Sequence, residues 1–266
     1  MTATAVYIGA STKMYLGYAQ TVDWLDRLAA ELDARPGLTD AGVVTYVIPS
    51  FPLLPAALDR LAPRGVLVGA QTVSWGSGAL TGEVSAALLA EMGVTLVEIG
   101  HAEPREHFGE TDEVIARKVD AADAAGLRTL LCVGEPERTD PGSAVEFCLG
   151  QVQSAIRSDA AKLASVWVAY EPVWAIGAQE PADPGYVTDV LSGLRAALGA
   201  LGDAVPPLIY GGSAGPGLLD RLPTADGLFL GRFAHDAARF AAVLDEASAR
   251  HRNDQVSAEK ESALYS

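Results

Sequence analysis

Short apolar runs alternate with longer segments of mixed polarity along most of the chain. The short runs are rich in β-branched and aromatic residues, which is typical of parallel strands buried on both faces. They predict strands at 6–9, 43–48, 66–70, 95–100, 128–133, 166–170, 207–210 and 228–230.

The segments between these runs repeat apolar residues every three or four positions, so they predict helices with one buried face. In 18–34, for example, Leu25, Leu28 and Leu32 fall on the same side. The other helices are expected at 53–61, 85–92, 112–125, 144–161, 186–201, 218–222 and 236–249.

Eight strand-then-helix units therefore follow one another without a change in composition. Parallel strands need crossover helices, and eight such units close into a barrel. We expect an α/β protein with one (β/α)8 barrel domain at 1–249 and a polar, disordered tail at 250–266. An open doubly wound sheet is the alternative. It would be expected to carry Gly-x-Gly-x-x-Gly after the first strand, and residues 9–13 lack that motif.

Composition and charge exclude several classes of protein. The 266 residues are 49% hydrophobic, which is enough for a large core. The formal net charge is −15, whereas nucleic-acid-binding proteins are usually basic or carry a basic stripe, so no nucleic-acid partner is expected. No apolar run approaches about 18 residues and no signal-peptide pattern is present, which predicts a cytoplasmic protein without a membrane partner. The two cysteines, Cys132 and Cys148, do not form a disulfide framework.

Reactive side chains stand where the predicted strands end. Ser11 and Lys13 follow the first strand, His101 and Glu103 the fourth, and Glu171 the sixth. In a (β/α)8 barrel these ends meet on one face, where the chemistry is carried out. A carboxylate, an imidazole and an ammonium group on that face are suited to moving a proton next to a carbonyl group.

Two glycine-rich turns complete the same face. Gly211-Gly212-Ser213 follows the seventh strand and Gly231-Arg232 the eighth. Loops at these places hold phosphate in many such barrels, because backbone N–H groups bind anions without any net positive charge. After Glu171, the rigid Pro172 and the apolar residues 173–177 predict a loop that closes over the site.

Each residue also has a plainer interpretation. Lys13 would be an exposed surface lysine, His101 a hydrogen-bonded core histidine, and Arg232 the partner of a neighbouring acid. The Gly211-Gly212 pair would be an ordinary tight turn. Their shared place at one end of the barrel favours a functional site.

Several long motifs are shared with one enzyme family. The longest is Ala169-Tyr170-Glu171-Pro172-Val173-Trp174-Ala175-Ile176-Gly177, and the others lie at 9–14, 69–71, 81–85, 98–103, 107–111, 132–135, 210–213 and 226–231. On these motifs the chain resembles the triosephosphate isomerase family over its length to about Leu244. The resemblance implies a TIM barrel and an isomerase of small phosphorylated sugars.

The resemblance also implies roles for single residues. Glu171 matches the catalytic base, His101 the neutral electrophile and Lys13 the substrate-binding cation, an arrangement well established for this family. The positions that match phosphate-binding or lid-latching residues are Gly177, Tyr210, Ser213 and Gly231. Thr81 matches the residue that reaches into the partner subunit, which implies a homodimer.

No metal or organic cofactor is implied by this chemistry. A metal site would need clustered ligands, and His101 and His107 stand six residues apart on a charged segment.

The chain departs from the usual family pattern at several site positions. Ser11 stands where Asn is usual, and Arg232 where the second Gly of a Gly-Gly pair is usual. Ala102 and Pro104 replace Ser and Arg, and the lid sequence at 178–182 is also atypical. These departures resemble the branch that interconverts L-erythrulose 1-phosphate and D-erythrulose 4-phosphate in erythritol catabolism.

A physical hypothesis accompanies that resemblance. A tetrulose phosphate carries one more hydroxymethyl group than a triose phosphate, so the smaller Ser11 would make room for it. Glu103 and Arg232 are then further candidates for substrate binding. The alternatives are triosephosphate isomerase proper and a catalytically silent barrel that binds phosphorylated ligands.

Overall fold

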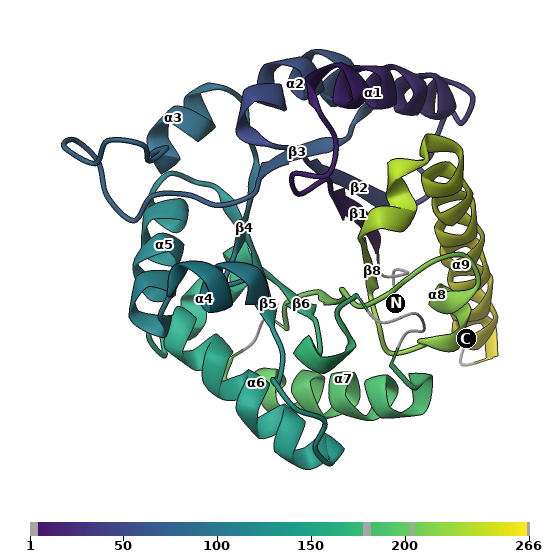
Figure 1. Cartoon of the computed structure of the whole chain (residues 1–266). Coiled ribbons are helices and arrows are strands. Elements are labelled where there is room, and N and C mark those ends of the chain that lie inside the picture. Colours follow the sequence, from purple (N-terminus) through teal and green to yellow (C-terminus); the bar gives the residue numbers. More distant parts are fainter. Residues whose placement is uncertain (1–4, 178–181, 203–204, 265–266) are drawn as a thin grey trace.

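Eight parallel strands run around the centre of the molecule in chain order and close into a barrel (Figure 1). The computed structural model describes residues 5–177, 182–202 and 205–264. The last strand pairs with the first, with Tyr7 opposite Gly227 and Ala10 opposite Leu230. The predicted (β/α)8 barrel is therefore confirmed. No helix in the described part of the chain is long and apolar enough to span a membrane.

The strands agree with the predicted positions to within about two residues at each end. Their bounds are β1 Val6–Ser11, β2 Val43–Ile48, β3 Leu67–Ala70, β4 Leu96–Ile99, β5 Arg128–Val133, β6 Val166–Tyr170, β7 Leu208–Tyr210 and β8 Gly227–Leu230.

The helices form a ring outside the strands (Figure 1). They are α1 Tyr18–Asp33, α2 Leu54–Leu61, α3 Ala86–Glu91, α4 Ala102–Phe108, α5 Asp112–Ala124, α6 Pro141–Ala155, α7 Pro184–Gly199, α8 Leu218–Arg221 and α9 Ala237–Leu264. Short 3-10 turns include η4 Val173–Ala175, directly after Glu171, and η5 Arg232–His235.

Alternate residues of each strand face the barrel interior and the helix layer. On β4, Leu96 packs inside the barrel, whereas Val97 and Ile99 pack in the layer between the strands and the helices. Large aromatic rings fill part of the interior: Tyr46 lies 5.6 Å from Trp167 and 5.8 Å from Phe229 between ring centroids. The interior is thus a packed core. At the carboxyl ends of the strands this core lies beneath the site.

Helix α4 was not predicted, since residues 102–108 have the composition of a charged turn. The structure shows why they are helical. The Nδ1 atom of His101 accepts the backbone N–H of Glu103 and caps the helix, at 3.1 Å. Pro104 lies in the first turn, where a missing N–H costs no helical hydrogen bond.

The end of the chain differs from the prediction. The last helix was expected to end at 249 with a disordered tail after it, but α9 continues to Leu264. Polar residues dock its extension: Arg250 donates to the carbonyl oxygens of Leu219 and Pro223. The side chain of His251 is buried over Gly42. Polar composition alone does not reveal such contacts, so the prediction failed.

Candidate active site

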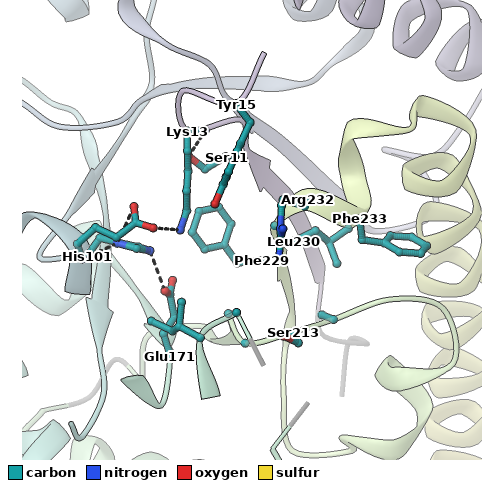
Figure 2. Close-up of a pocket in the computed structure, with 17 residues that line it drawn as sticks. Ser11, Lys13, Tyr15, His101, Glu171, Ser213, Phe229, Leu230, Arg232 and Phe233 are labelled. Atoms are coloured by element: carbon teal, nitrogen blue, oxygen red, sulfur yellow. Dashed lines mark hydrogen bonds and ion pairs between the residues drawn. The ribbon is translucent and has the colours of Figure 1, made fainter. Parts of the chain in front are cut away.

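A cavity of about 260 Å³ opens at the carboxyl ends of the strands. All of the residues predicted to bind substrate or to act in catalysis line it: Ser11, Lys13, His101, Glu103, Glu171, Gly177, Ser213, Gly231 and Arg232. Lys13, His101 and Glu171 converge on one side, with Ser213 and Arg232 across the cavity (Figure 2). The structure thus brings together side chains separated by more than 200 residues.

Lys13 is held by its backbone as well as by its side chain. Its φ of 45° lies in the left-handed region, which is uncommon for a lysine and is found where surrounding contacts impose it. Its carbonyl oxygen accepts hydrogen bonds from Ser50 Oγ at 2.7 Å and from Gln71 Nε2 at 2.9 Å. These contacts direct the ammonium group into the cavity.

The ammonium group of Lys13 donates to Glu103 Oε1 at 2.6 Å. Burial opposes the charged form of Lys13, but the hydrogen bond and the charge of Glu103 together raise its pKa above the ordinary value. Burial likewise opposes ionisation of Glu103, and Lys13 reverses this and lowers the pKa of that carboxyl. The pair therefore stays charged, and Lys13 is a fixed cation at neutral pH.

His101 is oriented by both ring nitrogens. Its Nδ1 atom accepts the backbone N–H of Glu103, so the neutral ring carries its proton on Nε2. That Nε2 lies 3.2 Å from Glu171 Oε2. Burial lowers the pKa of the imidazole, but the Glu171 carboxylate outweighs burial and raises that pKa to about 9. The charge state of His101 therefore depends on that of Glu171.

Glu171 is placed by the strands on either side of it. Its backbone N–H donates to Val133 O at 2.8 Å, which extends the β5–β6 ladder by one residue. A Cβ atom at Gly134, after β5, would lie 1.9 Å from Glu171 O. A Cβ atom at Gly211, after β7, would lie 2.4 Å from Glu171 Cγ. Both neighbours must be glycine for the carboxylate to take this position.

The start of the lid is tied to a buried carboxylate. Glu135 accepts hydrogen bonds from Tyr170 Oη at 3.1 Å, Trp174 Nε1 at 2.7 Å and Tyr186 Oη at 3.0 Å. These donors come from β6, η4 and α7. The hinge before the predicted lid is therefore anchored on both sides.

Most of the lid itself cannot be compared with the prediction, because residues 178–181 lie outside the described residues. At its far end, the Ala182 N–H donates to Tyr210 Oη at 3.2 Å. Tyr210 was expected to latch the lid, and this contact joins the lid to β7.

Arg232 lines the part of the cavity where phosphate binding was predicted, and its side chain is exposed. Its guanidinium carbon lies 5.9 Å from the Tyr15 ring centroid. Among the described residues Arg232 forms no salt bridge, which leaves its charge available to an anion.

The sequence did not single out Glu98, Tyr15 or Phe233. Glu98, which is 5% exposed, points into the barrel beneath the site. Burial raises its pKa to about 7, although the charges of His101 and Lys13 and a hydrogen bond from Ser11 act in the opposite direction. A single acid inside the apolar run of 95–100 was the signal that could have revealed it.

Known proteins of one family are similar to this chain over most of its length. The family model described as triosephosphate isomerase matches residues 6–247. An L-erythrulose-1-phosphate isomerase of Pectobacterium atrosepticum is 45% identical, over 93% of this chain and 97% of that protein. A triosephosphate isomerase of Herpetosiphon aurantiacus is 36% identical, over 89% and 97%.

A solved structure gives the same result. The crystal structure of triosephosphate isomerase from Bartonella henselae superposes with a TM-score of 0.77 and 28% identity. The match covers 90% of this chain and 98% of that one.

Proposed function

Because the chain belongs to the triosephosphate isomerase family, we propose that it is a cofactor-independent isomerase that converts L-erythrulose 1-phosphate to D-erythrulose 4-phosphate. The convergence of Lys13, His101 and Glu171 in one cavity carries the proposal of an isomerase. The choice of a four-carbon substrate is supported by the similarity to the P. atrosepticum enzyme and by Ser11.

The reaction moves one proton between neighbouring carbons. The Glu171 carboxylate takes the proton from C3 of L-erythrulose 1-phosphate. The electrons of the C3–H bond form a C2=C3 double bond, and those of the C2 carbonyl move to its oxygen. The O3 proton then passes to O2, the carbonyl forms at C3, and Glu171 returns its proton to C2. Renumbered from the other end, the product is D-erythrulose 4-phosphate.

His101 and Lys13 stabilise the charge that develops on the oxygens. The Nε2–H of His101 donates to them, and the Lys13 ammonium supplies a positive charge that needs no rearrangement. When Glu171 takes the substrate proton, it loses the charge that raises the pKa of His101. Burial and Lys13 then favour the neutral imidazole, which is the form that can donate one proton and accept another.

The phosphate lies at the opposite end of the cavity in this proposal. Backbone N–H groups at Gly177, Ser213 and Gly231 and the Arg232 guanidinium would hold it there. Closure of the lid would exclude water from the enediolate, which otherwise eliminates phosphate.

The test of the proposal is a comparison of two substrates. Purified protein is assayed with L-erythrulose 1-phosphate and with dihydroxyacetone phosphate. We expect kcat/KM to be about tenfold higher for the tetrulose phosphate, since one additional hydrogen bond to the substrate contributes up to about 1.5 kcal/mol. The reverse order would support the alternative, conversion of dihydroxyacetone phosphate to D-glyceraldehyde 3-phosphate.

Replacement of the proposed base tests the chemistry. Glu171→Gln is expected to lower kcat by about 10²- to 10⁴-fold and to abolish deuterium incorporation from D2O into substrate, because the amide cannot take a proton. Glu91→Gln, at the exposed end of α3, is the control. A wild type that exchanges no deuterium with either sugar phosphate would instead indicate a silent ligand-binding barrel.

The assembly and location proposed are a homodimer in the cytoplasm, without a nucleic-acid or membrane partner. The loop between β3 and α3, which contains Thr81, extends away from the barrel and is suited to entering a second subunit (Figure 1). Met14 and Phe108 are 90% and 84% exposed and would be covered in such a dimer. Analytical ultracentrifugation that finds only monomer would contradict this proposal.

A further inference from the structure

Glu98 is a buried acid with an unsatisfied oxygen. It lies on the interior face of β4, two residues after Leu96, and is 5% exposed. None of the described residues hydrogen-bonds its Oε2 atom. A buried carboxylate oxygen without a partner destabilises a fold by more than about 1 kcal/mol, so its presence needs an explanation.

The neighbours of Glu98 are the reacting groups of the site. Ser11 lines the same cavity as Glu98, and its hydroxyl favours the charged form of that carboxyl. The charge of Glu98 in turn acts on His101, Lys13 and Glu171. Glu98 therefore lies near enough to the groups proposed to transfer the proton to act on their charges.

Glu98 also lines a second cavity, of about 640 Å³, which borders the first. The two cavities share Ser11, Lys13, His101 and Glu103. The second cavity contains none of the residues proposed to hold the phosphate, namely Gly177, Ser213, Gly231 and Arg232. Glu98 thus lies on the side of the reacting groups that faces away from the phosphate, where the last carbon of a longer substrate would extend.

We infer that Glu98 is a specificity-determining residue whose free carboxyl oxygen accepts a hydrogen bond from the hydroxyl on C4 of the tetrulose phosphate, above the small side chain of Ser11. This assignment rests on the proposed function and identifies the group that recognises the hydroxyl on the fourth carbon of the substrate. A triose phosphate has no such hydroxyl and would leave the buried oxygen unsatisfied. Sites that hydrogen-bond a substrate hydroxyl discriminate strongly against substrates that lack it, for this reason.

A cycle of two enzymes and two substrates tests the inference. The substrates are L-erythrulose 1-phosphate and its 4-deoxy analogue, which keeps the fourth carbon but lacks its hydroxyl. The enzymes are wild type and Glu98→Val, which removes the acceptor from an apolar strand. The measured quantity is the ratio of kcat/KM between the two substrates. We expect this ratio to fall by about 10- to 100-fold in the variant, the value of one hydrogen bond to a charged group.

Three further measurements separate this role from others. Glu98→Gln keeps an oxygen acceptor and is expected to retain more of the ratio than Glu98→Val. Leu96→Val, at the preceding interior position of β4, is the matched control and should leave the ratio unchanged. Thermal melting shows whether the variants are folded.

A ratio that falls by less than tenfold in Glu98→Val overturns the inference. This includes an equal loss with both substrates, which would mean that Glu98 acts only through Lys13 and His101. Failure of the proposed function would be seen with the wild type alone, as a preference for dihydroxyacetone phosphate over L-erythrulose 1-phosphate. The inference would then be overturned too, because that substrate has no fourth carbon for Glu98 to bind.

Discussion

At the scale of single residues, the site is shaped as much by missing side chains as by reactive ones. Gly134 and Gly211 leave room for Glu171 between β5 and β7, where any Cβ atom would collide with it. Ser11, a small residue two positions before Lys13, lines the same cavity, and its hydroxyl favours the charged form of Glu98. The reactive groups therefore depend on small neighbours for their positions.

Gly211→Ala is expected to reduce catalysis while the barrel still folds. The new Cβ atom would lie 2.4 Å from Glu171 Cγ and 2.7 Å from its Oε1, so the flexible carboxylate has to move. A shift of about 1 Å in a catalytic group lowers the rate by up to about 100-fold, so we expect kcat to decrease by about one to two orders of magnitude. Gly150→Ala in α6, where a Cβ atom meets nothing within 4 Å, is the control. Steady-state kinetics and thermal melting measure both effects, and an unchanged kcat in Gly211→Ala would contradict the proposed position of the base.

Ser11→Asn tests the room beside Lys13. Ser11 is only 3% exposed, so the larger amide has to occupy space in the cavity. The ratio of kcat/KM for L-erythrulose 1-phosphate to that for dihydroxyacetone phosphate is expected to fall at least about tenfold, because one lost hydrogen bond or one steric contact is worth that much. If both substrates are affected equally, Ser11 does not select the substrate.

At the scale of elements, the strands position the site residues and the turns after them contain the predicted lid. Glu135 links β6, η4 and α7 through three hydrogen bonds. Tyr210, at the end of β7, accepts the N–H of Ala182, which follows the predicted lid. The predicted lid therefore lies between two contacts with the barrel, one at Glu135 and one at Tyr210.

Trp174→Phe removes one of these anchors. The indole N–H donates to Glu135 at 2.7 Å, and loss of a hydrogen bond to a charged group is expected to destabilise the fold by about 1–2 kcal/mol. A less firmly held hinge is also expected to lower kcat/KM several-fold. Urea unfolding and steady-state kinetics measure these effects. Tyr18→Phe, at an exposed tyrosine, is the control, and equal behaviour of the two variants would show that the Glu135 contact does not hold the lid.

The elements also show what the sequence could and could not reveal. The apolar runs predicted all eight strands, because barrel strands are buried on both faces. The strand ends and the family motifs predicted every residue proposed here to bind phosphate or to act as the base. Helix α4 was missed because its cap is the ring of His101, which no helix propensity includes. Glu98 was missed because the face of β4 that enters the barrel is set by its pairing with β3 and β5.

At the scale of the whole molecule, the protein is acidic overall and also buries several glutamates in and around the barrel. The net charge is −15, and Glu98, Glu135 and Glu171 are all buried within the barrel or at its end. Lys13 and His101 balance part of this charge inside the site. The stability of the fold should therefore depend on pH through these interior groups.

Glu98 gives this dependence a definite sign. The pKa of Glu98 is about 7 in the folded chain and 4.5 for a glutamate of the unfolded chain. Between these pH values the folded chain holds a proton that the unfolded chain has released. The stabilisation of the folded chain by this additional proton is fully present below pH 4.5 and is lost as the pH rises through 7. The charged groups around it are those of Lys13, His101 and Glu171.

Glu98→Gln removes the titrating carboxyl group, so a comparison with wild type gives the contribution of Glu98 to the pH dependence of stability. From about pH 5 to pH 8, the free energy of unfolding of wild type is expected to decrease relative to that of the variant by about 2–3 kcal/mol. Urea unfolding at several pH values and one fixed protein concentration measures it. Parallel curves for the two proteins would show that Glu98 titrates normally.

Glu171 is positioned by β5 and β7, whereas the residues proposed to select the substrate lie on other strands. This separation has a consequence for how such an enzyme acquires a new substrate. The proton-transfer geometry comes from backbone spacing on one arc of the ring, whereas Ser11 and Glu98 belong to β1 and β4, outside that arc. Substitutions on those two strands can therefore lengthen or shorten the accepted carbon skeleton without moving the backbone that positions the base. An engineer seeking a pentulose phosphate isomerase would begin at those two positions and leave both glycines untouched.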